Sequence, residues 1–141
     1  VTLKTWKLFG HDKNKDGIID EKDVMALTVD DFKIVTKVLY WDKWKADEIK
    51  NQSIAEILVD WFYNSGLPGI KIPQRILGLK EDGIVGKMTI AAVNSHDPRE
   101  LHERIVIARH QFYQDIIKRN PKLKKFEKGW LKRLYSYKFK E

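Results

Sequence analysis

The sequence of 141 residues contains no cysteine, which excludes disulfides and thiolate zinc sites and leaves the redox compartment open. It also lacks any apolar run near the ~18 residues that a membrane-spanning helix needs, so no membrane span is expected. The first residue is valine rather than methionine. We therefore expect the chain to be processed or part of a longer protein, with any signal segment out of view.

Apolar residues make up 43% of the chain and include five Trp, five Tyr and six Phe, enough for a real core. The length fits one compact domain. Apolar spacing and capping residues predict helices over residues 2–9, 28–41, 53–65, 70–79, 87–94, 98–119 and 127–138. Asp97 and Pro98 form an N-cap and an N1 proline for the longest of them. No segment reads as a strand, so the predicted fold class is all-α.

Positive charge is concentrated at the end of the chain. The net charge is +7, and residues 118–141 hold ten Lys or Arg against two Glu, which leaves the rest near −1. A basic segment favours an anionic partner, such as nucleic acid, a membrane surface or an anionic cell wall, although a solvated helix face explains it equally well. Because no nucleic-acid reading motif occurs, a nucleic-acid partner is not expected.

A calcium loop is predicted at residues 12–23. Oxygen-bearing side chains fall at EF-hand positions 1, 3, 5, 9 and 12, a backbone carbonyl at position 7, and Gly17 stands at position 6, where the loop turns sharply. The predicted Ca²⁺ ligands are Asp12, Asn14, Asp16, Ile18, Asp20 and Asp23. Asp23 replaces the usual Glu, as in dockerin-type loops, which this one resembles. With no second loop, we expect a structural ion rather than a sensor.

Several short motifs follow one another in a fixed order. Residues 74–79 read Q-R-I-L-G-L, and residues 82–89 read D-G-I-V-G-K-M-T, a turn that needs two glycines before a helix. Together they resemble peptidoglycan-binding helical modules. Further motifs stand at residues 40–43 (Y-W-D-K), 60–66 (D-W-F-Y-N-S-G) and 126–133 (F-E-K-G-W-L-K-R).

This series resembles glycoside hydrolase family 108, the bacterial and phage N-acetylmuramidases often called secretion activator proteins. The resemblance implies a lysozyme-like helical domain with the calcium loop inserted. Residues 1–50 would be the remainder of the hydrolase part and residues 51–141 the peptidoglycan-binding part, packed as one compact unit. It also implies peptidoglycan glycan strands as the partner and a location in the cell envelope or outside the cell. We expect a monomer.

The catalytic acid of that family lies in an E-G-G motif, and the sequence contains none. By the resemblance Val1 falls just after the catalytic segment, so no catalytic residue is assigned and the chain itself is expected to be inactive. Glycoside cleavage needs a carboxylic acid and a second group that handles water or the oxocarbenium ion. The predicted substrate-binding residues are Tyr40, Trp41, Asp60 and Asn64. Asp60 and Asn64 match the family pattern and lie with Glu56 at i, i+4 and i+8 on one helical face, although a solvated face explains that spacing too. Aromatic residues at a helix end, such as Tyr40 and Trp41, are more often part of the core.

Two other functions stay open. A non-catalytic peptidoglycan-binding or secretion-accessory module would use the same fold without cutting, and a nucleic-acid binder has only the basic segment in its favour. His11, His96, His102 and His110 share no metal-ligand spacing and are expected to be surface or satisfied side chains. We also expect Leu101, Ile105, Ala108, Phe112 and Ile116 to form the apolar side of the longest helix.

Overall fold

The computed structural model describes residues 29–140. The chain divides into two compact units, Val1–Asp42 and Lys43–Glu141. The helix predicted at residues 2–9, the calcium loop at residues 12–23 and His11 lie outside the described residues. The domain boundary predicted after residue 50, and the packing of both parts as one unit, stay predictions.

The described part of the first unit is a helix. Helix α3 spans Val29–Thr36 and continues into a wider π-type turn, η1, at Lys37–Trp41. The backbone N–H of Asp42 donates to the carbonyl of Lys37 at 2.8 Å and closes that turn. The helix predicted to end at Trp41 is therefore confirmed in its described part.

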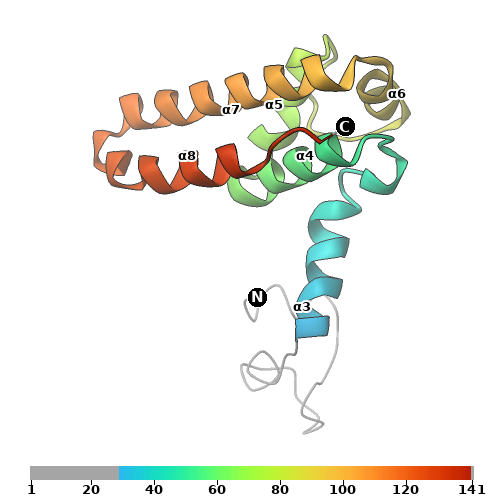
Figure 1. Cartoon of the computed structure of the whole chain (residues 1–141), viewed down its shortest axis with the longest axis horizontal. Coiled ribbons are helices and arrows are strands. Elements are labelled where there is room, and N and C mark those ends of the chain that lie inside the picture. Colours follow the sequence, from blue (N-terminus) through green and yellow to red (C-terminus); the bar gives the residue numbers. More distant parts are fainter. Residues whose placement is uncertain (1–28, 141) are drawn as a thin grey trace, which may run out of the picture. The chain divides into compact units, whose positions relative to one another are not determined.

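Helices also make up the second unit (Figure 1). They are η2 (Ala46–Glu48), α4 (Gln52–Ser65), α5 (Pro68–Ile76), α6 (Lys87–Ser95), α7 (Pro98–Arg119), η3 (Pro121–Phe126) and α8 (Glu127–Ser136). Helices α7 and α8 lie side by side as a hairpin joined through η3, and α4 packs against both α5 and α7. No strand occurs between residues 29 and 140, so the all-α prediction is confirmed.

Side-chain caps fix where two of the helices begin. The Asp97 carboxylate accepts from the backbone N–H of Glu100 at 3.1 Å, which confirms the predicted start of α7. Helix α4 begins earlier than predicted, because Asn51 rather than Ser53 is its N-cap and accepts from Ile54 N–H at 3.1 Å. The Ser53 hydroxyl instead accepts from the backbone N–H of Lys140 at 2.9 Å and ties the end of the chain to α4.

Helix α5 begins two residues before its predicted start, with Pro68 in its first turn. Pro73 lies inside the helix, where it removes one backbone hydrogen bond, and the helix ends three residues later at Ile76. Gly69 allows α5 to approach α4 closely, since a Cβ at this position would lie 2.6 Å from the backbone nitrogen of Phe62. At Gly69 the backbones of α4 and α5 therefore lie in close contact.

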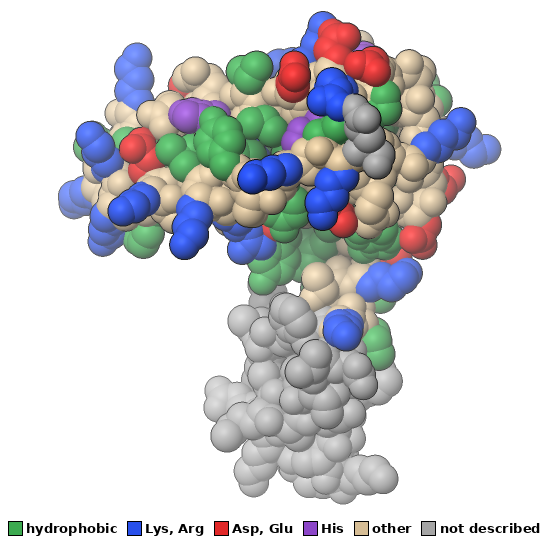
Figure 2. All heavy atoms as spheres, in the orientation of Figure 1, with side chains coloured by type: hydrophobic (Ala, Val, Ile, Leu, Met, Phe, Trp, Pro, Cys, Tyr) green, Lys and Arg blue, Asp and Glu red, His purple; other side chains and the backbone are tan. Residues whose placement is uncertain are grey.

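Large apolar side chains from all the long helices fill the core of this unit. The most deeply buried are Trp44, Ile54, Ile57, Leu58, Trp61, Leu101, Ile105, Tyr113 and Leu134. Lys and Arg side chains gather around the end of the α7–α8 hairpin, where Figure 2 shows them facing solvent. Within residues 29–140, no helix is both long and apolar enough to span a membrane.

Candidate functional site

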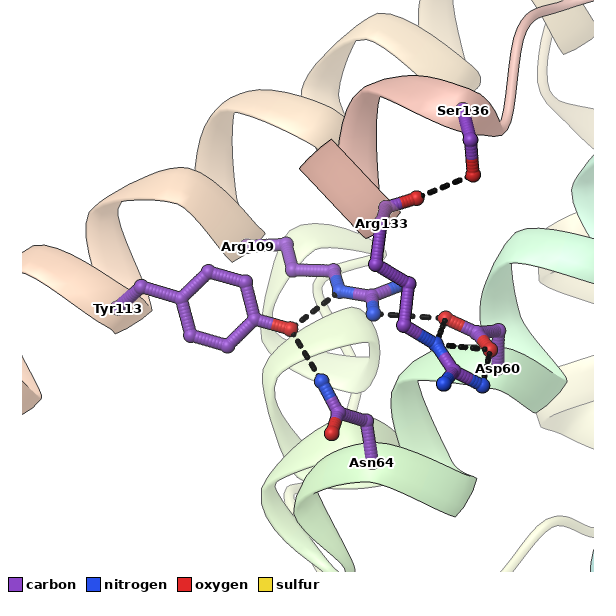
Figure 3. Close-up of polar contacts among 6 residues, drawn as sticks. All are labelled: Asp60, Asn64, Arg109, Tyr113, Arg133 and Ser136. Atoms are coloured by element: carbon purple, nitrogen blue, oxygen red, sulfur yellow. Dashed lines mark hydrogen bonds and ion pairs between the residues drawn. The ribbon is translucent and has the colours of Figure 1, made fainter. Parts of the chain in front are cut away.

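A buried carboxylate on α4 holds two arginines from two other helices (Figure 3). Arg109 on α7 donates from Nη2 to Oδ2 of Asp60 at 2.7 Å. Arg133 on α8 donates from Nη2 and Nε to Oδ1 of Asp60, at 2.6 and 3.0 Å. Asp60 therefore joins three helices at one point, and we call these three residues the Asp60 cluster.

The environments of the two arginines differ. The Arg109 side chain is completely buried, whereas that of Arg133 is 46% exposed. Arg109 also donates from Nε to the hydroxyl of Tyr113 at 2.9 Å, and its Nη1 has no hydrogen-bond partner among the described residues. A buried guanidinium cannot lose its proton, so its charge depends on Asp60 for compensation.

Asn64 lies one turn after Asp60 on α4 and extends the network. Its amide nitrogen donates to the hydroxyl of Tyr113 at 2.8 Å, so that oxygen accepts from both Asn64 and Arg109. The carbonyl oxygen of Asn64 points away from the cluster in Figure 3, and the residue is exposed. The amide nitrogen of Asn64 is thus held by Tyr113, whereas its amide oxygen points away from the network.

The pKa of the Asp60 carboxyl is held below its ordinary value. Burial raises the pKa of its carboxyl, but hydrogen bonds from Arg133 and Arg109 and the charge of Arg109 lower it by more, so the pKa lies below 3.8. A general acid for glycoside cleavage needs the opposite, a carboxyl whose pKa is raised so that it still holds a proton. Asp60 can balance charge or accept hydrogen bonds, but it cannot supply that proton.

Aromatic side chains extend the cluster along the α7–α8 hairpin. The Tyr113 ring stacks on Trp130 with centroids 5.2 Å apart, and Trp130 stacks on Phe126 at 5.9 Å. The Arg133 guanidinium lies 5.4 Å from the centre of the Tyr63 ring. The motifs at residues 60–66 and 126–133, far apart in sequence, thus contact each other.

The D-G turn motif has an internal structural role. Gln74 is 1% exposed; its amide nitrogen donates to Oδ1 of Asp82 at 3.0 Å and to the carbonyl of Ile84 at 2.9 Å. Its carbonyl oxygen accepts from the N–H of Gly83, which has a φ of +73°. Thr89, the last residue of the motif, lies 3.4 Å from the same amide nitrogen. The motif therefore holds a turn between α5 and α6.

The predicted substrate-binding residues lie in both units. Tyr40 and Trp41 belong to the first unit and are half-buried, whereas Asp60 and Asn64 belong to the second. Glu56 is exposed and accepts from Gln52 at 3.3 Å. The structure brings Asp60 and Asn64 together through Arg109 and Tyr113. Contacts of Tyr40, Trp41, Asp60 and Asn64 with sugars stay predictions.

The described histidines have local protein contacts. His102 is buried against the edge of Phe139, with ring centroids 5.6 Å apart, and burial lowers its pKa below 6.5. Nδ1 of His110 lies 2.6 Å from the hydroxyl of Tyr135, and Nδ1 of His96 lies 2.8 Å from the carbonyl of Ala92. No group of three metal-ligating side chains occurs in the part of the chain that the structure describes.

Sequence analysis missed four residues that organise this region: Arg109, Tyr113, Arg133 and Gln74. The apolar side of α7 was predicted through Ala108 and Phe112, but the buried series is Leu101, Ile105, Arg109, Tyr113 and Ile117. An arginine in an otherwise apolar i, i+4 series is the signal that pointed to it, once an acidic partner such as Asp60 is sought. Arg133 and Gln74 stood inside the quoted motifs without an assigned role.

Two known protein families match consecutive segments of the chain. The family described as glycosyl hydrolase 108 matches residues 1–66, and the family described as predicted peptidoglycan domain matches residues 68–135. The solved structure of SagA from Brucella abortus is similar over 97% of this chain and 74% of that one, with a TM-score of 0.75 and 23% identity. That likeness shows the fold. No curated protein matches the sequence.

Proposed function

Since residues 1–66 belong to the glycosyl hydrolase 108 family and residues 68–135 to the predicted peptidoglycan domain family, we propose that the protein is a lysozyme-like N-acetylmuramidase of the cell wall. The observation that carries this proposal is the order of the two matches, which together take in nearly the whole chain. Peptidoglycan strands are the substrate, and the site of action is the cell envelope or the extracellular space.

The reaction is hydrolysis of the β-1,4 bond after N-acetylmuramic acid. A carboxylic acid donates a proton to the leaving oxygen, water adds to the anomeric carbon, and the water's second proton passes to a base. Hydrogen bonding lowers the pKa of Asp60 and that of Asp82 below 3.8, so neither carboxyl holds the proton that this step needs. We therefore assign the acid to an E-G-G segment, which these 141 residues do not contain.

The second candidate function is a peptidoglycan-binding module without catalysis, with a secretion-accessory role. The lowered pKa of Asp60 supports it, because the buried carboxylate that links α4, α7 and α8 acts as a structural anion. Both candidates share the same substrate contacts. They differ in the E-G-G segment.

We expect the 141-residue chain to sediment with purified peptidoglycan sacculi and to leave their turbidity unchanged. A chain extended by a native upstream segment with E-G-G is expected to clear the suspension, and a Glu→Gln change in that motif to abolish clearing. Cellulose is the control polysaccharide. Failure to sediment with sacculi would contradict the proposed function, and clearing by the 141-residue chain would show that the acid is wrongly placed.

We also propose that residues 12–23 bind a structural Ca²⁺ ion through the six predicted ligands. Calcium at about a hundredfold excess over its Kd is expected to raise the melting temperature by roughly 5–10 °C, and EDTA to reverse this. Asp12→Ala/Asp16→Ala should abolish the shift, whereas Glu103→Ala, an exposed acid on α7, should keep it. A melt unchanged by both calcium and EDTA would rule out the site.

A further inference from the structure

A groove of about 470 Å³ runs between α5 and α7, within the second unit. This volume falls in the ~300–1,000 Å³ range of ligand pockets. The half-buried side chains of Ile72, Ile76 and Phe112 give it an apolar floor. The groove is separate from the Asp60 cluster, none of whose three residues lines it.

Charged side chains surround that floor. Arg75 is neutralised by Glu81, with Nη2 and Oε1 2.8 Å apart. Lys71 and Arg119 are exposed and have no ion-pair partner among the described residues. Asp115, an acidic side chain, accepts from Gln111 at 2.9 Å. The groove therefore offers two free cations and one anion around an apolar surface.

This combination fits a peptide better than a sugar chain. The glycan strand of peptidoglycan is neutral, because the lactyl carboxyl of muramic acid is amide-linked to the peptide stem. The stem carries the carboxylates, the free amino group of its diamino acid and the alanine methyls. Sugar rings pack on open aromatic faces, but Phe112, the one aromatic ring that lines the groove among the described residues, already meets Trp61 edge to face at 5.9 Å.

We propose that the α5–α7 groove binds the peptide stem of peptidoglycan rather than its glycan strand. Lys71 and Arg119 pair with stem carboxylates, Asp115 binds the free amino group, and the floor of Ile72, Ile76 and Phe112 takes the alanine methyls. The inference rests on the proposed function, which supplies the polymer, and it adds the part of the polymer that is recognised.

Calorimetry with a soluble stem tetrapeptide tests the groove directly. We expect binding that Lys71→Gln/Arg119→Gln weakens roughly five- to thirtyfold, since two exposed charge contacts are lost. The matched control is Lys128→Gln/Lys132→Gln, which removes the same charge from exposed sites on α8 outside the groove. Equal weakening by both pairs would show general electrostatic attraction and overturn the assignment. Thermal melts verify that each variant folds.

A soluble stem tetrapeptide added to intact sacculi separates this inference from the proposed function. In excess, the tetrapeptide should compete for the groove and reduce sedimentation of the chain with the sacculi. Sedimentation unchanged by the tetrapeptide, or a neutral N-acetylglucosamine oligomer competing with the stem peptide in calorimetry, would overturn the groove and leave the proposed function standing. No sedimentation with intact sacculi would instead reject the proposed function, and stem binding in calorimetry would then still support the groove.

Discussion

Asp60→Asn is expected to lower the free energy of unfolding by about 3–5 kcal/mol, because it leaves the charge of Arg109 buried without compensation. Arg109 is completely buried, and Asp60 is its only ion-pair partner among residues 33–140. Arg133 is 46% exposed and can turn towards water. Arg133→Met should therefore cost only about 1 kcal/mol.

Urea denaturation followed by circular dichroism gives these values. Glu56→Gln is the matched control, since Glu56 is an exposed carboxylate one turn earlier on the same helix, and it should change the free energy of unfolding by less than about 0.5 kcal/mol. Asp60→Asn combined with Arg109→Met should be less destabilised than the sum of the single changes, because no buried charge is left. A loss below about 1 kcal/mol in Asp60→Asn would contradict the structural role of this ion pair.

The Asp60–Arg109 pair also makes the free energy of unfolding depend on pH in the acid range. The unfolded carboxyl titrates near 3.8 and the folded pKa is lower, so the contribution of Asp60 is complete above pH 3.8 and is lost as the pH falls through the folded pKa. The difference in free energy of unfolding between the natural chain and Asp60→Asn should therefore shrink as the pH falls below 3.8. A difference independent of pH would mean that the carboxylate charge is not what stabilises the fold.

Gly69→Ala is expected to destabilise the second unit by about 2–3 kcal/mol, although alanine is ordinarily the better helix former. The new Cβ would lie 2.6–2.7 Å from backbone atoms of Trp61 and Phe62. Backbone atoms cannot rotate away as a flexible side chain does, so α5 must move off α4. The ring contacts of Trp61 and the α5–α7 groove would shift together with α5.

Gly129→Ala on α8 is the control, because nothing lies within 4 Å of a Cβ built there. It should stabilise the chain by up to about 1 kcal/mol through helix propensity alone. Thermal and urea unfolding of the two variants should thus give opposite signs. A stabilised Gly69→Ala would show that α4 and α5 are farther apart than the structure has them.

Local signals in the sequence predicted the local structure well. Asp97 and Pro98 mark the start of α7 where capping chemistry places it, and the order of short motifs indicated the family. Contacts between residues far apart in the sequence were harder to predict. The face of α7 was misassigned because Arg109 counts as polar by composition, and its burial depends on Asp60, which lies 49 residues away in sequence.

The same difference between local structure and long-range contacts holds for the candidate site. Asp60 and Asn64 were singled out from their i, i+4 spacing, and the structure gives them a shared network with Tyr113. Spacing alone could not show that two arginines occupy the Asp60 carboxylate, since both come from other helices. Likewise, Gln74 lies in a motif that resembles peptidoglycan-binding modules, but in the structure its amide holds the turn that follows.

The Asp60 cluster also limits how the two matched segments could be exchanged between proteins by recombination. Asp60 belongs to the stretch matched by the hydrolase family, whereas Arg109 and Arg133 belong to the stretch matched by the peptidoglycan family. The border between the two matches therefore cuts through a single folded body. A gene fusion that transferred only the second stretch would carry a buried arginine without its counter-ion. A transferred segment that keeps this ion pair must begin no later than α4, and a segment that begins at the family border is expected to be less stable, because Arg109 is left buried without Asp60.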